Sequence, residues 1–100
     1  MGWVNDARRE LAGGRQAQVR PSGGSMRGRI ESGQLVTLAP IEPSEVRLDD
    51  VVLVEWRGSF LLHVVKEVGE DRLLIGNNVG KINGWVPSTA VIGKVIAVED

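Results

Sequence analysis

The sequence contains no cysteine and only one histidine among its 100 residues. Without thiols there is no disulfide framework, thiolate nucleophile or cysteine metal ligand. One imidazole is too few for a zinc site built from histidines, so we expect neither a metal nor another cofactor. No apolar run approaches the roughly 18 residues of a membrane-spanning helix, and the N-terminus lacks the apolar core of a secretory signal. These absences predict a small, soluble, cytoplasmic protein.

A large excess of one charge is also missing, because the formal net charge is −1. A protein that binds nucleic acid mainly through phosphate contacts usually carries a clear positive excess, so no nucleic acid is expected as a partner. The first 30 residues nevertheless hold six arginines against two acidic residues. This basic segment could dock on the acidic remainder of the chain or present a weak surface to an anionic partner. A nucleic-acid-binding β-barrel that uses this segment is the weakest alternative.

The length and the hydrophobic pattern predict one domain with a single helix at its N-terminus. Residues 3–12 carry apolar side chains at helical spacing and are followed by Gly13-Gly14, which indicates a short amphipathic helix within residues 1–15. Short apolar runs separated by turn residues then predict strands at 16–20, 34–39, 51–56, 59–68, 72–75 and 91–98. The expected fold is mainly β: a small antiparallel coiled β-sheet or barrel formed by residues 16–100.

Two connections in the β-region have distinct patterns. Arg57-Gly58 between two apolar runs predicts a tight hairpin, and Gly93 within the last strand indicates a bulge. Residues 76–84 (GNNVGKING) predict a loop whose asparagines bond to its own backbone. An alternative is that this loop forms the rim of a groove, with Trp85 as one wall.

Ser25 and His63 are the candidates for chemistry. Ser25 follows Gly23-Gly24, and glycines allow a sharp turn that leaves the next side chain accessible. His63 lies within a predicted strand, and an imidazole suits general-base catalysis near neutral pH. Strand alternation places His63 and Lys66 on opposite faces, so only one of them can serve a given nucleophile. Each residue alone is a weak signal, because such loops and strand histidines are common structural features.

The order of several short motifs is more specific than any one of them. Ser25-Met26 is followed by Gly33-Gln34, Asp49-Asp50-Val51-Val52, Leu62-His63-Val64-Val65 and Gly76-Asn77-Asn78. This order resembles the catalytic domain shared by signal peptidases and LexA-type self-cleaving repressors, over roughly residues 20–98. Histidine rather than lysine at the base position is similar to the histidine-dependent signal peptidases. The resemblance implies that Ser25 is the nucleophile and His63 the general base of a serine endopeptidase.

The same resemblance implies roles for other side chains. The backbone N–H of Ser25, with Ser22 beside it, would form the oxyanion hole, and Asn77 would support the base. Met26 would line the groove that binds a peptide or protein substrate, and Trp85 joins it if the loop of residues 76–84 forms the rim of that groove. An extended substrate would pair with an exposed strand edge beside the site.

Two departures from the family pattern favour an alternative function. Gln34 and Asn77 stand where the pattern has aspartates, and an amide orients an imidazole without stabilising its charged form as a carboxylate does. A catalytically inactive module that binds peptides or proteins on the same fold is therefore the alternative. Asp50 is expected to fix a turn rather than to act in catalysis. The helix of residues 3–12 is expected to dock on the β-domain, although it could contact an anionic membrane weakly.

Overall fold

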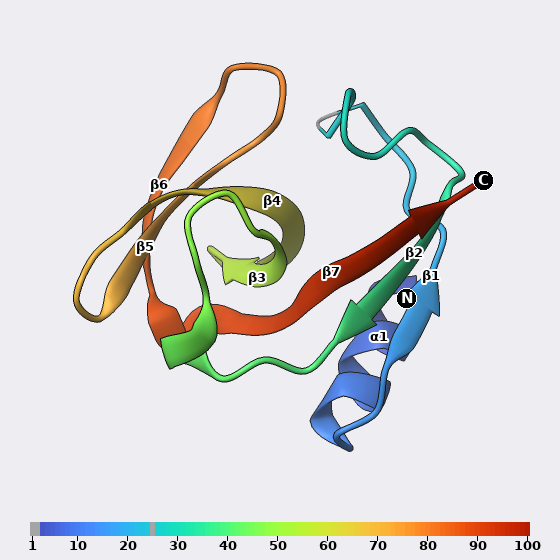
Figure 1. The fold of residues 1–100 in the computed structure, drawn as a ribbon, viewed down its shortest axis with the longest axis horizontal. Helices are drawn as coiled ribbons and strands as arrows, with labels where there is room; N and C mark the ends of the chain where they lie inside the picture. Colours follow the sequence, from blue (N-terminus) through green and yellow to red (C-terminus); the bar gives the residue numbers. More distant parts are fainter. Residues whose placement is uncertain (1–2, 25) are drawn as a thin grey trace.

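The computed structural model describes residues 3–24 and 26–100, and within them a single α-helix precedes a seven-stranded sheet (Figure 1). The elements are α1 (Trp3–Ala12), β1 (Ala17–Val19), β2 (Leu35–Ala39), β3 (Val51–Trp56), β4 (Ser59–Val68), β5 (Arg72–Gly76), β6 (Ile82–Pro87) and β7 (Val91–Glu99). Two short 3-10 helices, η1 (Pro43–Glu45) and η2 (Ser88–Ala90), precede β3 and β7. All strand pairs are antiparallel, in the order β1-β2-β7-β3-β4-β5-β6.

This architecture confirms the predicted mainly β fold with one N-terminal helix. The sheet is strongly coiled, and β4 curls around its centre in Figure 1. It remains open rather than closing into a barrel, because β1 and β6 lie at its two edges in the described part of the chain. β3 and β4 form the predicted hairpin, with Arg57 and Gly58 at its tip at φ angles of 50° and 81°. Positive φ at both positions is typical of a two-residue hairpin turn.

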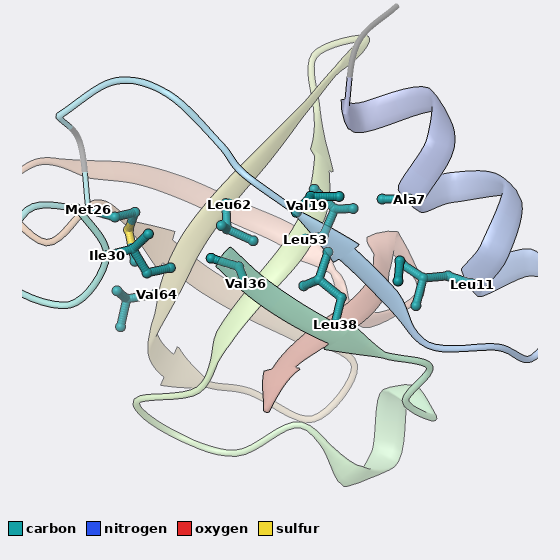
Figure 2. Close-up of a cluster of buried hydrophobic side chains, with 11 residues drawn as sticks. Ala7, Leu11, Val19, Met26, Ile30, Val36, Leu38, Leu53, Leu62 and Val64 are labelled. Atoms are coloured by element: carbon teal, nitrogen blue, oxygen red, sulfur yellow. The ribbon is translucent and has the colours of Figure 1, made fainter. Parts of the chain in front are cut away.

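The β3–β4 hairpin is buried on both faces, which explains its nearly continuous apolar sequence. Leu53, Leu62 and Val64 belong to one buried cluster, which also includes side chains from α1, β1 and β2. Figure 2 shows this cluster reaching from Leu11 on α1 to Met26 and Ile30. Their neighbours along the strands turn to a second cluster, formed with β5, β6 and the start of β7, which contains Val52, Val54, Val65, Leu73 and Ile75.

The helix α1 docks on the sheet, as expected. Ala7 and Leu11 are its buried residues, and they lie four positions apart on one face. Leu11 packs on β7 at Gly93, where an added Cβ would lie 2.8 Å from its Cδ1 atom. A register shift beside Gly93 confirms the predicted bulge in this strand. The glycine therefore allows both the bulge and the close contact with α1.

The strand β6 is absent from the sequence-based prediction, which assigned residues 76–84 to a loop and no strand to 82–87. Its sequence contains Asn83, Gly84 and Pro87, all of which are disfavoured within strands. The strand forms at the edge of the sheet, where a proline is tolerated. Gly84 has a φ of 151°, and a Cβ there would meet the Trp56 ring at 2.9 Å. Packing against Trp56 thus requires a glycine at position 84, and the same glycine made the strand difficult to predict from the sequence.

Candidate active site

A cavity of about 190 Å³ lies between the N-terminal half of β4, the first turn of α1 and the segment after β1. Ser22 and Met26 line it together with His63, so three of the predicted site residues share one cavity. Met26 is buried and belongs to the core, whereas Ser22 is exposed at the rim. Ser25, the predicted nucleophile, lies outside the described residues. Gly23, two residues before Ser25, and Met26, directly after it, line the cavity.

His63 is buried, with 6% of its surface exposed, and its ring is oriented by the backbone of its own strand. Its Nδ1 atom lies 2.6 Å from the carbonyl oxygen of Leu62. A carbonyl oxygen only accepts hydrogen bonds, so Nδ1 carries the proton in this contact. In the neutral ring Nε2 is then the unprotonated nitrogen and can accept a proton. This contact therefore favours the tautomer in which Nε2 is the basic nitrogen.

The edge of β4 next to the cavity has no strand partner in the described part of the chain. β5 pairs with β4 only from Val64 onward, whereas β3 pairs along Ser59–Val64. Alternation from the Trp56–Ser59 pair beside the hairpin turn directs the N–H and C=O groups of Phe60 and Leu62 away from β3. The Leu62 carbonyl already accepts from His63, and Phe60 presents both backbone groups to an added strand.

The segment between β1 and β2 has little regular structure and is held by polar side chains. Arg29 forms an ion pair with Asp49, and its Nε atom donates to Asn78 Oδ1 at 2.8 Å. Asn78 in turn donates to the carbonyl oxygen of Arg27 at 2.7 Å. Within the segment, Glu31 Oε2 accepts from the Gly28 N–H at 2.9 Å. Sequence reasoning missed Arg29 and Glu31, because their roles depend on contacts that no local pattern predicts.

The side-chain amides of Asn77 and Gln34 bind loop backbone. Asn77 is buried, and its Oδ1 atom accepts from the N–H groups of Val79 and Lys81, both at 2.9 Å. This geometry agrees with the predicted loop role of the asparagines. Gln34 Oε1 accepts from the Glu31 N–H at 2.7 Å, and its amide nitrogen donates to Asp100. Both side chains therefore hold loops, and their described contacts are not with His63.

Two further expectations concern Asp50 and Trp85. Asp50 Oδ2 accepts from the Arg47 N–H at 2.9 Å, and its other oxygen lies 3.2 Å from Lys94 Nζ, so the carboxylate does fix a turn. Trp85 lies on β6, where its ring stacks on the Arg72 guanidinium at 4.2 Å. It lines two separate hollows, beside Trp56 and beside Asp71, rather than the cavity that His63 lines. The structure thus does not bring Trp85 together with the other predicted site residues.

The N-terminal arginines mostly bind groups within their own region of the chain. Arg9 lies 3.7 Å from Asp6, Arg15 lies 2.6 Å from Glu10, and Arg20 donates to the Gly33 carbonyl. Arg29, paired with Asp49, bridges to the acidic remainder. No α-helix in residues 3–24 and 26–100 has the length and hydrophobicity needed to cross a membrane. The same residues contain no cluster of three acidic or histidine side chains suited to a metal.

Comparison of the chain with models of protein families, with curated proteins and with solved structures gives no match. The interpretation of the cavity therefore depends on its own geometry and on the motifs in the sequence.

Proposed function

We propose that the protein is a serine endopeptidase similar to the signal peptidase and LexA-type enzymes, with Ser25 as nucleophile and His63 as general base. The observation that carries this proposal is the hydrogen bond from His63 Nδ1 to the Leu62 carbonyl. It leaves Nε2 as the proton acceptor of a residue that lines the same cavity as Gly23 and Met26.

The reaction proceeds in two steps that use the same nitrogen. His63 Nε2 takes the proton of Ser25 Oγ as that oxygen attacks the substrate carbonyl carbon. The imidazolium then gives this proton to the leaving amine as the C–N bond breaks, and an acyl ester remains on Ser25. A water molecule next attacks the ester and gives a proton to Nε2. The ester bond breaks, the acid is released, and the proton returns to Ser25 Oγ.

The Leu62 carbonyl supports the base in place of a side-chain acid. A backbone oxygen carries a partial negative charge, so it orients the ring and favours the imidazolium more weakly than a carboxylate. This arrangement fits the engagement of Asn77 and Gln34 in loop contacts. The substrate is a peptide or protein in an extended conformation, whose backbone adds to the free edge of β4 at Phe60. Ser22 at the cavity rim supplies a hydroxyl for the oxyanion.

A fluorophosphonate probe, which forms a covalent adduct with an activated serine, tests this function directly. We expect mass spectrometry to find the adduct on Ser25, and we expect His63→Ala and Ser25→Ala each to abolish it. Ser44→Ala, which alters an exposed serine in η1, is the matched control and should be labelled as fast as the wild type. Circular dichroism checks that each variant is folded. Peptide cleavage that survives Ser25→Ala would refute the proposal.

A non-catalytic peptide-binding module is the second candidate, and the loop contacts of Asn77 and Gln34 favour it. In this case the same edge of β4 would hold a peptide that is never cut. Binding of peptides without fluorophosphonate labelling or hydrolysis would support this module over the peptidase.

A further inference from the structure

The first turn of α1 forms part of the wall of the cavity that His63 lines. Trp3 is half-buried and lines the cavity together with Phe60, Met26 and Ile30. Trp3, Ala7 and Leu11 are spaced by four residues, so they lie along one face of the helix. The position of the Trp3 ring is therefore set by the docking of α1 rather than by the sheet.

The docking of α1 is tight at three points. Ala7 is completely buried, and its small side chain lets the helix approach the sheet closely. Leu11 packs on Gly93, as described above. The Arg8 guanidinium lies 4.2 Å from the centre of the Phe60 ring, a favourable cation–π contact. Phe60 thus contacts α1 and also lines the cavity, which couples the helix to the proposed substrate site.

The size and lining of the cavity indicate what it can hold. Its volume of about 190 Å³ is similar to that of an enclosed apolar cavity of about 150 Å³ known to bind benzene, but it is partly open to solvent. Trp3, Met26, Ile30 and Phe60 provide apolar walls, and the polar part of the lining comes from Ser22, Glu31, Ser32 and His63. The cavity therefore suits one apolar side chain of up to about the size of a phenyl group.

We propose that Trp3 is a specificity-determining residue, which forms one wall of the cavity and limits it to one apolar side chain of the size of leucine, methionine or phenylalanine. The substrate class is thus an extended peptide that carries such a side chain next to its contact with the β4 edge. This inference rests on the proposed function only for the statement that the bound molecule is a substrate. The cavity itself can be tested without catalysis.

The first test uses benzene and indole as probes. Their binding is measured in NMR titrations from the shifts of the amide and methyl resonances of the protein. Wild-type protein should bind benzene, with shifts at Met26 and Ile30, and should bind indole weakly. Trp3→Ala should bind indole at least about tenfold more tightly than wild type, because one methylene in an apolar pocket already changes discrimination by about 10–200-fold. Trp85→Ala, which removes an indole ring outside this cavity, is the matched control and should bind both probes as wild type does.

Trp3→Phe protects the test against loss of the helix. If the α1 resonances show that Trp3→Ala undocks α1, Trp3→Phe keeps an aromatic anchor and should give a smaller gain in indole binding. Unchanged affinities for both probes in a Trp3 variant that retains α1 would overturn the proposal. So would shifts on the two probes that avoid the cavity residues.

The second test uses a peptide mixture of random sequence, with cleavage products identified by mass spectrometry. Wild-type protein should cut beside medium apolar side chains, and Trp3→Ala should extend this preference to tryptophan. Unchanged preferences in a Trp3→Ala variant that still cleaves would overturn the inference. If no variant cleaves any peptide but indole binding responds to Trp3, the peptidase function fails and the role of Trp3 in shaping the cavity stands.

Discussion

The two faces of the β3–β4 hairpin are equally buried but covered by different kinds of structure. On one face Val52 and Val65 pack beneath other strands, β5, β6 and the start of β7. On the other face Leu53 and Leu62 pack beneath α1, β1, β2 and the segment that carries Met26 and Ile30. The cavity that His63 lines lies where α1 and this segment meet β4. On the face of Leu53 and Leu62, a helix and an irregular segment thus leave a cavity. On the face of Val52 and Val65, regular strand packing fills the corresponding space.

The two coverings also differ in what holds them. β5 and β6 are held by backbone strand pairing to their neighbours, and each of these pairings is interrupted by one register shift. The segment between β1 and β2 is held instead by the buried side chains of Met26 and Ile30, by isolated backbone hydrogen bonds and by polar contacts of Arg29 and Asn78. Segments held in this way open at a lower free-energy cost than central strands. The cavity is therefore bounded by the part of the molecule that single substitutions can most easily change.

The largest expected effect distinguishes the two faces by removing one leucine from each. Leu73→Ala in the strand-covered cluster should cost about 2–5 kcal/mol of unfolding free energy, because Leu73 is fully buried and leaves a new cavity. Leu62→Ala should cost the lower part of about this range, since the vacated space joins an existing cavity. Urea denaturation of both variants measures the difference.

Ligand binding gives the matching functional measurement. Leu62→Ala should change the affinity for benzene, because Leu62 lines the cavity, whereas Leu73→Ala should leave the affinity of the folded protein unchanged. An equal loss of stability with no change in benzene affinity for either variant would remove the distinction between the faces.

The fold followed from the sequence wherever its local patterns matched the packing. The helix of residues 3–12 and the central strands were predicted because their apolar side chains recur at the spacing of the buried faces. β6 was missed because Gly84 and Pro87 are disfavoured in a typical strand. The edge position of β6 tolerates Pro87, and the close Trp56 ring requires Gly84. Here tertiary contacts override the local preferences of the residues.

The candidate site followed from the sequence less completely. The sequence suggested Ser22, Met26 and His63 as site residues, and all three line one cavity. It also suggested Trp85, which lies on β6 and lines a different hollow. The roles of Trp3 and Phe60 in the cavity are contacts between segments far apart in the chain, and no pattern within either segment predicts them. The contact between His63 and the Leu62 carbonyl joins adjacent residues, yet it depends on the orientation of the His63 ring, which no sequence pattern predicts.

A smaller loss of unfolding free energy is expected when the segment between β1 and β2 loses the polar contacts of Arg29. Arg29→Ala removes the ion pair with Asp49 and the hydrogen bond to Asn78. Hydrogen bonds to charged groups contribute about 1.5–3 kcal/mol, and exposure of the Asp49 carboxylate reduces this, so we expect a loss of about 1 kcal/mol. Arg15→Ala, which breaks an exposed pair with Glu10, is the matched control and should cost less than about 1 kcal/mol.

Hydrogen exchange locates the effect of Arg29→Ala. Faster exchange should be confined to the segment around Met26 and Ile30, while the amides of β5 keep their protection. Equally faster exchange in β5 would mean that the segment between β1 and β2 and the strands β5 and β6 unfold together.

The smallest expected change in stability comes from the tip of the β3–β4 hairpin, which connects the two strands that form both faces. Arg57 has a φ of 50°, a left-handed conformation that costs most residues about 1–2 kcal/mol and asparagine less. Arg57→Asn also loses the stacking of Arg57 on Trp56, worth about 0.5–1 kcal/mol at an exposed site, so we expect a net gain of about 0.5 kcal/mol. Arg57→Ala loses the stacking without a better conformation and should be less stable than wild type in urea denaturation. Because the turn fixes the register of β3 and β4 together, neither variant should alter benzene affinity. An Arg57→Asn protein less stable than wild type would show that stacking on Trp56 outweighs the strain of the turn.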